Sequence, residues 1–154
     1  MDAFLAALEA SAFAEALRTS FVAYPLVNAF HILALGALVT AVILLDLRVL
    51  GGLRSVAGEP FIALMRRVAL LAFAGAAVSG FLLFSVRPID YAGNPAFLAK
   101  LALIGLAVLN FALLAHSGRG RGRAEAPSMR VAAVLSLVFW PAALVAGRFI
   151  GFVE

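Results

Sequence analysis

The segment that decides the fold is residues 21–45, FVAYPLVNAFHILALGALVTAVILL. It contains no charged residue, and about 20 apolar residues suffice to cross the hydrocarbon core of a bilayer. Asp46, Leu47 and Arg48 follow at once and mark the point where the apolar run stops. The run therefore predicts a membrane-spanning helix over 21–45.

Three further apolar runs predict three more spans, at about 68–86, 96–115 and 131–152. Pro141 interrupts the last of them and is predicted to kink that helix. Ahead of the spans, within residues 1–20, apolar side chains recur at roughly helical spacing between the charged residues Asp2, Glu9 and Arg18, which predicts a short amphipathic helix at the membrane interface. The predicted fold is all-α, with an interfacial helix over 1–20 and a four-helix transmembrane domain over 21–154.

Composition excludes several classes of protein. Of the 154 residues 65% are hydrophobic and only 13% are charged, whereas about a quarter of a soluble domain is charged. The absence of cysteine excludes disulfides, iron–sulfur clusters and thiolate metal sites. With no carboxylate expected inside a span and no nucleophile–base pair, the chain is not predicted to be a stand-alone enzyme or a carboxylate-based proton-coupled transporter.

The positions of the basic residues predict the orientation in the membrane and give no indication of nucleic-acid binding. Eight basic residues near the span ends share one face and four share the other, and the richer face is expected in the cytoplasm. Both termini are then periplasmic, in the inner membrane. The first face has Arg48, Arg54, Arg66, Arg67, Arg119, Arg121, Arg123 and Arg130, and the second has Arg18, Arg87, Lys100 and Arg148.

His31 is the candidate functional residue, because an ionisable side chain inside the bilayer is costly and usually functional. Asn28 lies three residues earlier on the same helical face, and Ser79 and Trp140 are expected at similar depth, so the four could form one polar layer. The functional interpretations of His31 are a haem-iron ligand, a quinone hydrogen-bond donor, or a proton or metal relay. The structural alternative is a neutral histidine that ties two helices together.

The second histidine, His116, closes the third span about 12 Å away in depth from His31, at 1.5 Å per residue. That separation argues against both histidines binding one iron. His116 is either the ligand of a separate site or a solvated helix end.

Charged residues near the span ends have two interpretations each. Asp46 and Arg48 are predicted to form an interfacial ion-pair network with Arg66 and Arg67, or else a site for an acidic headgroup or carrier. Lys100 is close enough to the end of its span to extend to the headgroups. At the end of the fourth span, Arg148 either does the same or pairs with Asp90 or Glu15.

The order of several short motifs resembles a known family. These are His31 early in the first span, the exit Asp46-Leu47-Arg48, Phe97 to Lys100 opening the third span, and Gly147-Arg148 near the end of the fourth. In this order the chain resembles, over residues 25–152, a bacterial family of small four-helix inner-membrane proteins of unknown function. It is also distantly similar in layout to the membrane domain of copper-resistance D-type proteins. The resemblance implies a fold and a bacterial inner-membrane location, and no activity.

Three functions are compatible with these features. The first is a haem-b-binding electron-transfer module, with His31 as axial ligand, that acts as a homo-oligomer or in a larger complex and exchanges electrons with a quinone or a partner. The second is a non-catalytic accessory or assembly subunit. The third, metal or small-solute permeation, lacks soft ligands along its path, because the methionines at 1, 65 and 129 lie outside the spans.

Overall fold

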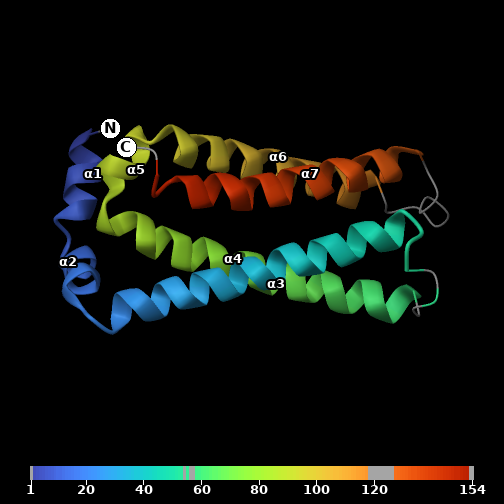
Figure 1. Cartoon of the computed structure of the whole chain (residues 1–154), viewed down its shortest axis with the longest axis horizontal. Coiled ribbons are helices and arrows are strands. Elements are labelled where there is room, and N and C mark those ends of the chain that lie inside the picture. Colours follow the sequence, from blue (N-terminus) through green and yellow to red (C-terminus); the bar gives the residue numbers. More distant parts are fainter. Residues whose placement is uncertain (1, 54, 56–57, 118–126, 153–154) are drawn as a thin grey trace.

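Long antiparallel helices form the molecule, as the computed structural model shows for residues 2–53, 55, 58–117 and 127–152 (Figure 1). The four long helices are α3 (Ala23–Val49), α4 (Gly58–Val86), α6 (Pro95–Ser117) and α7 (Pro127–Phe149). Each is long and apolar enough to cross a membrane. The predicted all-α, four-helix transmembrane fold is confirmed, and the chain is a multi-pass membrane protein.

Two short helices, α1 (Asp2–Glu9) and α2 (Ala12–Thr19), lie across one end of the bundle (Figure 1). The sequence predicted one helix here, and Ser11 is the reason for two. Its hydroxyl donates to the Leu8 carbonyl and accepts from the Ala14 amide, at 2.7 and 3.2 Å, so that it ends α1 and caps α2. The end that α1 and α2 cover is called the α1 end below.

The long helices pair as two hairpins, α3 with α4 and α6 with α7, and the hairpins meet mainly where α3 packs against α7. Leu38, Ala107 and Trp140 are the centre of the core, and the Phe73 ring meets the Trp140 indole edge-on with centroids 6.1 Å apart. Most other buried side chains are alanine or serine, which allow close helix approach in a membrane.

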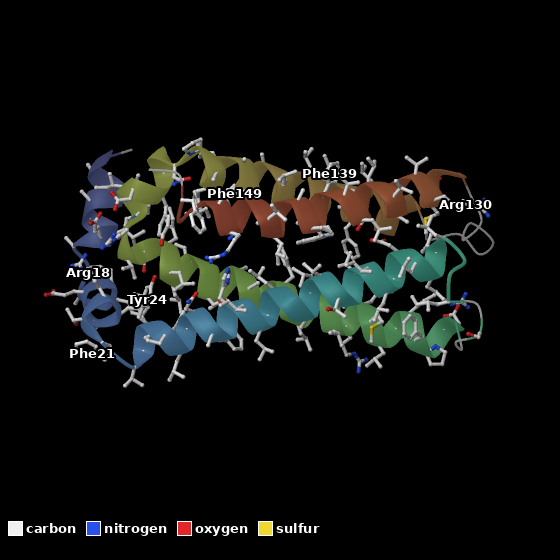
Figure 2. The ribbon with its side chains drawn as sticks, in the orientation of Figure 1. Arg18, Phe21, Tyr24, Arg130, Phe139 and Phe149 are labelled. Carbon is white, nitrogen blue, oxygen red and sulfur yellow. The ribbon has the colours of Figure 1, made fainter. Side chains whose placement is uncertain are left out.

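Large apolar side chains cover the outside of the bundle, as expected for a lipid-facing surface (Figure 2). Arg18 and Arg130 lie at opposite ends of the molecule in the same view. Helix α6 is the most peripheral span, with 6% of its apolar window buried against 22–28% in the other three.

Helix α3 ends later than the apolar run did. Two glycine amides satisfy carbonyls of its last turn. The Gly52 amide donates to the Leu47 carbonyl at 2.8 Å, and the Gly51 amide donates to the Arg48 carbonyl at 3.2 Å. Gly51 has φ 92°, the left-handed conformation that this type of helix end requires. The helix therefore continues through Asp46 to Val49, and Asp46 lies inside it.

The connection from α4 to α6 includes the short helix α5 (Pro88–Gly93) at the α1 end. Asn94 then begins α6, because its Oδ1 accepts from the Ala96 and Phe97 amides at 2.9 and 3.2 Å. Its Nδ2 donates to the Ile150 carbonyl at 3.2 Å, which ties the start of α6 to the end of α7. The Phe84, Tyr91 and Phe97 rings stack within 5.4–6.2 Å and hold α4, α5 and α6 together.

Candidate functional site

The centre of the candidate site is a hydrogen bond between α3 and α4, in which His31 Nδ1 lies 2.9 Å from Ser79 Oγ. The Ser79 hydroxyl has one proton, and it donates that proton to the Gly75 carbonyl at 2.6 Å. Ser79 Oγ must then accept from His31, so the Nδ1 of the imidazole carries a proton. A neutral imidazole in this tautomer has a free lone pair on Nε2.

Glycine makes room for this ring on α4. A Cβ built on Gly80 would lie 3.0 Å from His31 Cε1 and 3.9 Å from Nε2, so the imidazole rests directly on the helix backbone. One turn earlier, Gly75 does the same for the Phe30 ring, which would lie 3.2 Å from such an atom. The α3–α4 contact at this level therefore depends on two glycines and one serine.

Lys100 extends into the same region from α6. A Cβ built on Gly147 of α7 would lie 3.3 Å from Lys100 Cδ and 3.5 Å from Nζ, so the side chain lies along that helix. The ammonium acts electrostatically on the His31 imidazole. Lys100 is half-buried and has no hydrogen-bond or ion-pair partner among the described residues. It therefore lies within the bundle, whereas the sequence suggested that it would extend to the headgroups.

Of the four residues predicted to form one polar layer, only two are in contact. His31 and Ser79 are bonded to each other, whereas Asn28 is exposed on the surface of α3. Trp140 packs with Leu38 and Phe73, seven residues from His31 and six from Ser79 in sequence, or about 10 Å along the helices. The predicted depth of Trp140 was wrong because the helices begin and end at other residues than the apolar runs from which the depth was counted.

Asp46 corrects the expectation that no spanning helix carries a carboxylate. It is 7% exposed and interacts with the Ser136 hydroxyl of α7, which is also buried. Its second oxygen, Oδ2, is buried without a partner in the described part of the structure. The apolar run stopped at Asp46, but the helix stops only at the Gly51 turn, so this carboxyl is carried into the bundle.

The arginines predicted to form an ion-pair network with Asp46 lie elsewhere in the described structure. Arg48 extends to the start of α4, where its Nη2 would lie 3.0 Å from a Cβ on Gly58, and its Nε is buried and unpaired among the described residues. Arg66 and Arg67 are exposed on α4. Residues 46 and 48 point to opposite sides of a helix, which separates the carboxylate from the nearest cation in sequence.

Of the other two predicted residues, one is exposed and one has its side chain outside the described part of the structure. Arg148 is exposed at the end of α7, with its guanidinium 5.2 Å from the centre of the Phe152 ring. His116 lies in the last turn of α6, and its side chain is outside the described residues.

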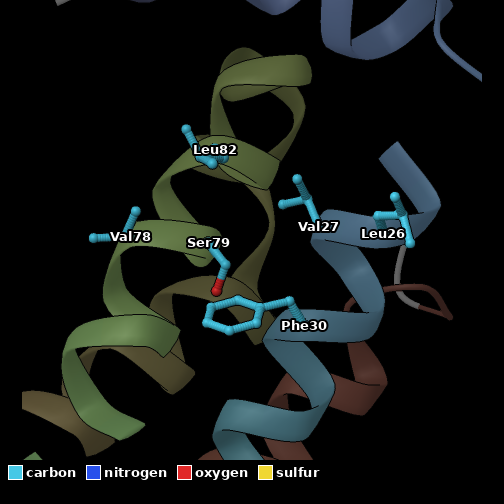
Figure 3. Close-up of a pocket in the computed structure, with 6 residues that line it drawn as sticks. All are labelled: Leu26, Val27, Phe30, Val78, Ser79 and Leu82. Atoms are coloured by element: carbon cyan, nitrogen blue, oxygen red, sulfur yellow. The ribbon is translucent and has the colours of Figure 1, made fainter. Parts of the chain in front are cut away.

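Two apolar hollows of about 240 and 290 Å³ lie along the surface of the α3–α4 hairpin and share Phe30. Ser79 is the one hydroxyl-bearing residue of the first hollow, where its oxygen points toward the Phe30 ring (Figure 3). The remaining lining is aliphatic, with Leu26, Val27, Val78 and Leu82. The hollows are suited to an alkyl or isoprenoid chain, and Ser79 joins the first of them to the polar centre.

Sequence reasoning missed the inward path of the Lys100 side chain. The one available signal was the position of Lys100, five residues after Pro95 and therefore inside the span.

Outside the spans, burial raises the pKa of the Tyr91 phenol, and Tyr24 raises it further. The aromatic stack at the α1 end is thus neutral at physiological pH.

Comparisons of the chain with protein-family models, with curated proteins and with solved structures find no match. The resemblance drawn from the short motifs stays a prediction, and the functional argument depends on the geometry of the site.

Proposed function

We propose that this chain is a membrane subunit of a redox complex that binds a membrane-dissolved quinol at His31. The observation that carries the proposal is the lone pair on His31 Nε2, which follows from the Nδ1–Ser79 hydrogen bond. A quinol hydroxyl is a donor that reaches such a site from the lipid phase. The imidazole accepts its hydrogen bond at Nε2 and thereby orients the ring of the quinol in the site.

The apolar hollows support the same ligand class. A quinol has a polar ring and an isoprenoid chain, and the hollows beside Ser79 offer that chain an aliphatic surface on α3 and α4. Ser79 links the two environments, since it borders the first hollow and holds the imidazole. A ligand entering between lipid and helix would therefore meet His31 with its ring end.

The test is binding of a decyl-benzoquinol, kept reduced under anaerobic conditions, to the protein in phosphatidylcholine nanodiscs. Trp140 is the only tryptophan, so quenching of its fluorescence reports binding. We expect saturable binding that is weakened about tenfold or more in His31→Ala, as for the loss of a well-placed hydrogen bond in a site without water. Asn28→Ala, an exposed change one turn away, is the matched control. Equal binding by the wild type and His31→Ala would exclude the proposal.

Haem b is the second candidate, favoured by the same lone pair. Iron coordinates the imidazole nitrogen opposite the one that donates a hydrogen bond, and Ser79 would be the partner that fixes the ring. A flat macrocycle would need the two hairpins to separate at the level of Gly80 and Gly147. An absorption spectrum of protein extracted from its native membrane tests this directly. A Soret band that sharpens with dithionite and is lost in His31→Ala supports haem, and a colourless protein excludes it.

The accessory-subunit alternative predicts neither ligand. A colourless protein that also leaves Trp140 fluorescence unquenched, but co-purifies with larger membrane proteins, would support that function. Because α6 is the most peripheral span, partner contacts are expected first along α6.

We also propose that the α1 end faces the periplasm of a bacterial inner membrane, as the distribution of arginine and lysine predicts. The chain has no cysteine, so single cysteines can be introduced without removing any. Labelling of intact spheroplasts by a membrane-impermeant maleimide should modify Thr19→Cys, near the α1 end, and spare Ser55→Cys at the opposite end. The reverse pattern would overturn this orientation.

A further inference from the structure

Lys100 is a cation that the proposed quinol contact leaves without a role. Its side chain starts on α6, about one and a half turns inside the helix, and lies along Gly147 of α7 rather than along lipid. Glycine at position 147 permits this path, because any side chain there would meet the methylene groups of Lys100 at 3.3–3.4 Å. The sequence of α7 thus leaves space for an ammonium group inside the bundle.

The charges around this ammonium are unbalanced. Among the described residues no carboxylate pairs with Lys100, and the group on which it acts is the His31 imidazole. The last carbonyls of α7 lie nearby, since Gly147 is two residues before the end of the helix, and their partial negative charge lowers the cost of placing a cation here. They do not neutralise a full positive charge, so an anion has a favourable place beside Lys100 and His31.

We propose that the site formed by Lys100 and His31 binds a membrane-soluble ligand that carries an anionic oxygen. The Lys100 ammonium binds that oxygen, and His31 Nε2 accepts from a neighbouring hydroxyl or remains free. The inference rests on the proposed function, because it specifies the charge of the ligand at the same centre. It goes further in predicting that an ionised amphiphile binds more tightly than its neutral form.

Two sources offer this chemistry: an ionised ring hydroxyl of a quinone-type molecule and the phosphate of a lipid headgroup. Both combine an anionic oxygen with an apolar chain, and the hollows on α3 and α4 are suited to either chain. The two are distinguished by measuring the soluble ligand in membranes with and without anionic lipid.

The experiment uses an alkyl hydroxynaphthoquinone, which is an anion at neutral pH, and its methyl ether, which cannot ionise. Quenching of Trp140 fluorescence is measured in phosphatidylcholine nanodiscs. We expect the wild type to bind the anion about tenfold or more tightly than the ether, the size of effect typical of a hydrogen bond to a charged group in a dry site. Lys100→Met should abolish this preference, and Lys100→Arg should keep most of it.

Arg87→Met is the matched control, because Arg87 is an exposed cation at the same end of the bundle. Circular dichroism and monodispersity in detergent establish that each variant is folded. If phosphatidylglycerol in the nanodisc displaces the anionic probe in a Lys100-dependent manner, the inference holds with a lipid phosphate as the ligand. Equal affinity for anion and ether, unchanged in Lys100→Met, overturns it.

The two proposals fail separately. Neutral decyl-benzoquinol that binds through His31, without any preference for the anionic probe, would retain the quinol function and exclude the anionic ligand. An anionic probe that binds through Lys100, while the quinol does not bind at all, would retain the anion site and exclude the quinol.

Discussion

Helix α3 carries His31 toward the α1 end and Asp46 toward the opposite end, and the surroundings of these two side chains are of opposite character. His31 is hydrogen-bonded to the Ser79 hydroxyl and feels the charge of the Lys100 ammonium, and it meets no carboxylate among the described residues. Asp46 meets the hydroxyl of Ser136 and pairs with no cation among the described residues. The first environment favours an anion beside Lys100 or a hydroxyl donor at His31, and the second favours a carboxyl whose charge is neutralised by a proton or a bound cation.

An apolar layer separates the two. They are 15 residues apart on α3, about 22 Å at 1.5 Å per residue, and Leu38, Phe73 and Trp140 fill the bundle between them. A continuous proton path between His31 and Asp46 is therefore not expected in this conformation. His31 and Asp46 therefore belong to separate sites, the first completed by α4 and α6 and the second by α7.

The largest loss of stability is expected from a cavity in the apolar layer between His31 and Asp46. Trp140→Ala removes the largest buried side chain of the core and should lower the free energy of unfolding by about 3 kcal/mol, the usual cost of such a cavity. Phe149→Ala, an exposed aromatic on the same helix, should change it by less than about 0.5 kcal/mol. Unfolding by sodium dodecyl sulfate in mixed micelles, followed by circular dichroism, measures both. Similar losses in the two variants would mean that Trp140 is not the core of the bundle.

The next effect separates His31 from its support on α4. Gly80→Ala places a methyl group 3.0 Å from the imidazole, which Ser79 holds in place, and should destabilise the protein by about 1–3 kcal/mol. Gly36→Ala has open space and should be neutral or slightly stabilising, because alanine favours a helix. The same unfolding titration compares the two variants. If Gly80→Ala is as stable as Gly36→Ala, the ring does not rest on α4.

A smaller effect measures the contact at the other end of α3. Asp46→Ala, Ser136→Ala and the double variant form a cycle whose interaction free energy should be about 1–2 kcal/mol, since the carboxyl and the hydroxyl are both buried. The corresponding cycle between Asp46 and the exposed Arg66 is the control and should give about zero. A substantial value for the Arg66 cycle would instead support the ion-pair network.

The smallest effect concerns the tautomer of His31. Ser79→Ala removes the acceptor of the Nδ1 proton and should cost about 1 kcal/mol of stability. Nitrogen-15 NMR of labelled histidine should show Nδ1 protonated in the wild type and a mixture of tautomers in Ser79→Ala. The exposed-site variant Asn28→Ala should leave the spectrum as in the wild type. Protonation of Nε2 in the wild type would contradict the basis of the proposed function.

Much of the fold could be predicted from residues 21–45 and the three later apolar runs. In a bilayer each chain segment must satisfy its own backbone hydrogen bonds, so a long uncharged run has essentially one structure open to it. The same reasoning identified His31 as the residue of interest and Ser79 as a residue at its depth. The spans, and the positions of His31 and Ser79 along them, follow from the composition and length of each apolar run alone.

Only the tertiary structure decided which side chains meet. Whether Lys100 faces lipid or His31, and whether Asp46 lies outside the bundle or against Ser136, depends on the rotation of each helix and on where its last turn closes. Helix rotation is set by small residues such as Gly80 and Gly147, and the end of α3 by Gly51. These contacts join helices distant in sequence, and side-chain packing of this kind leaves no periodic signal in an apolar run.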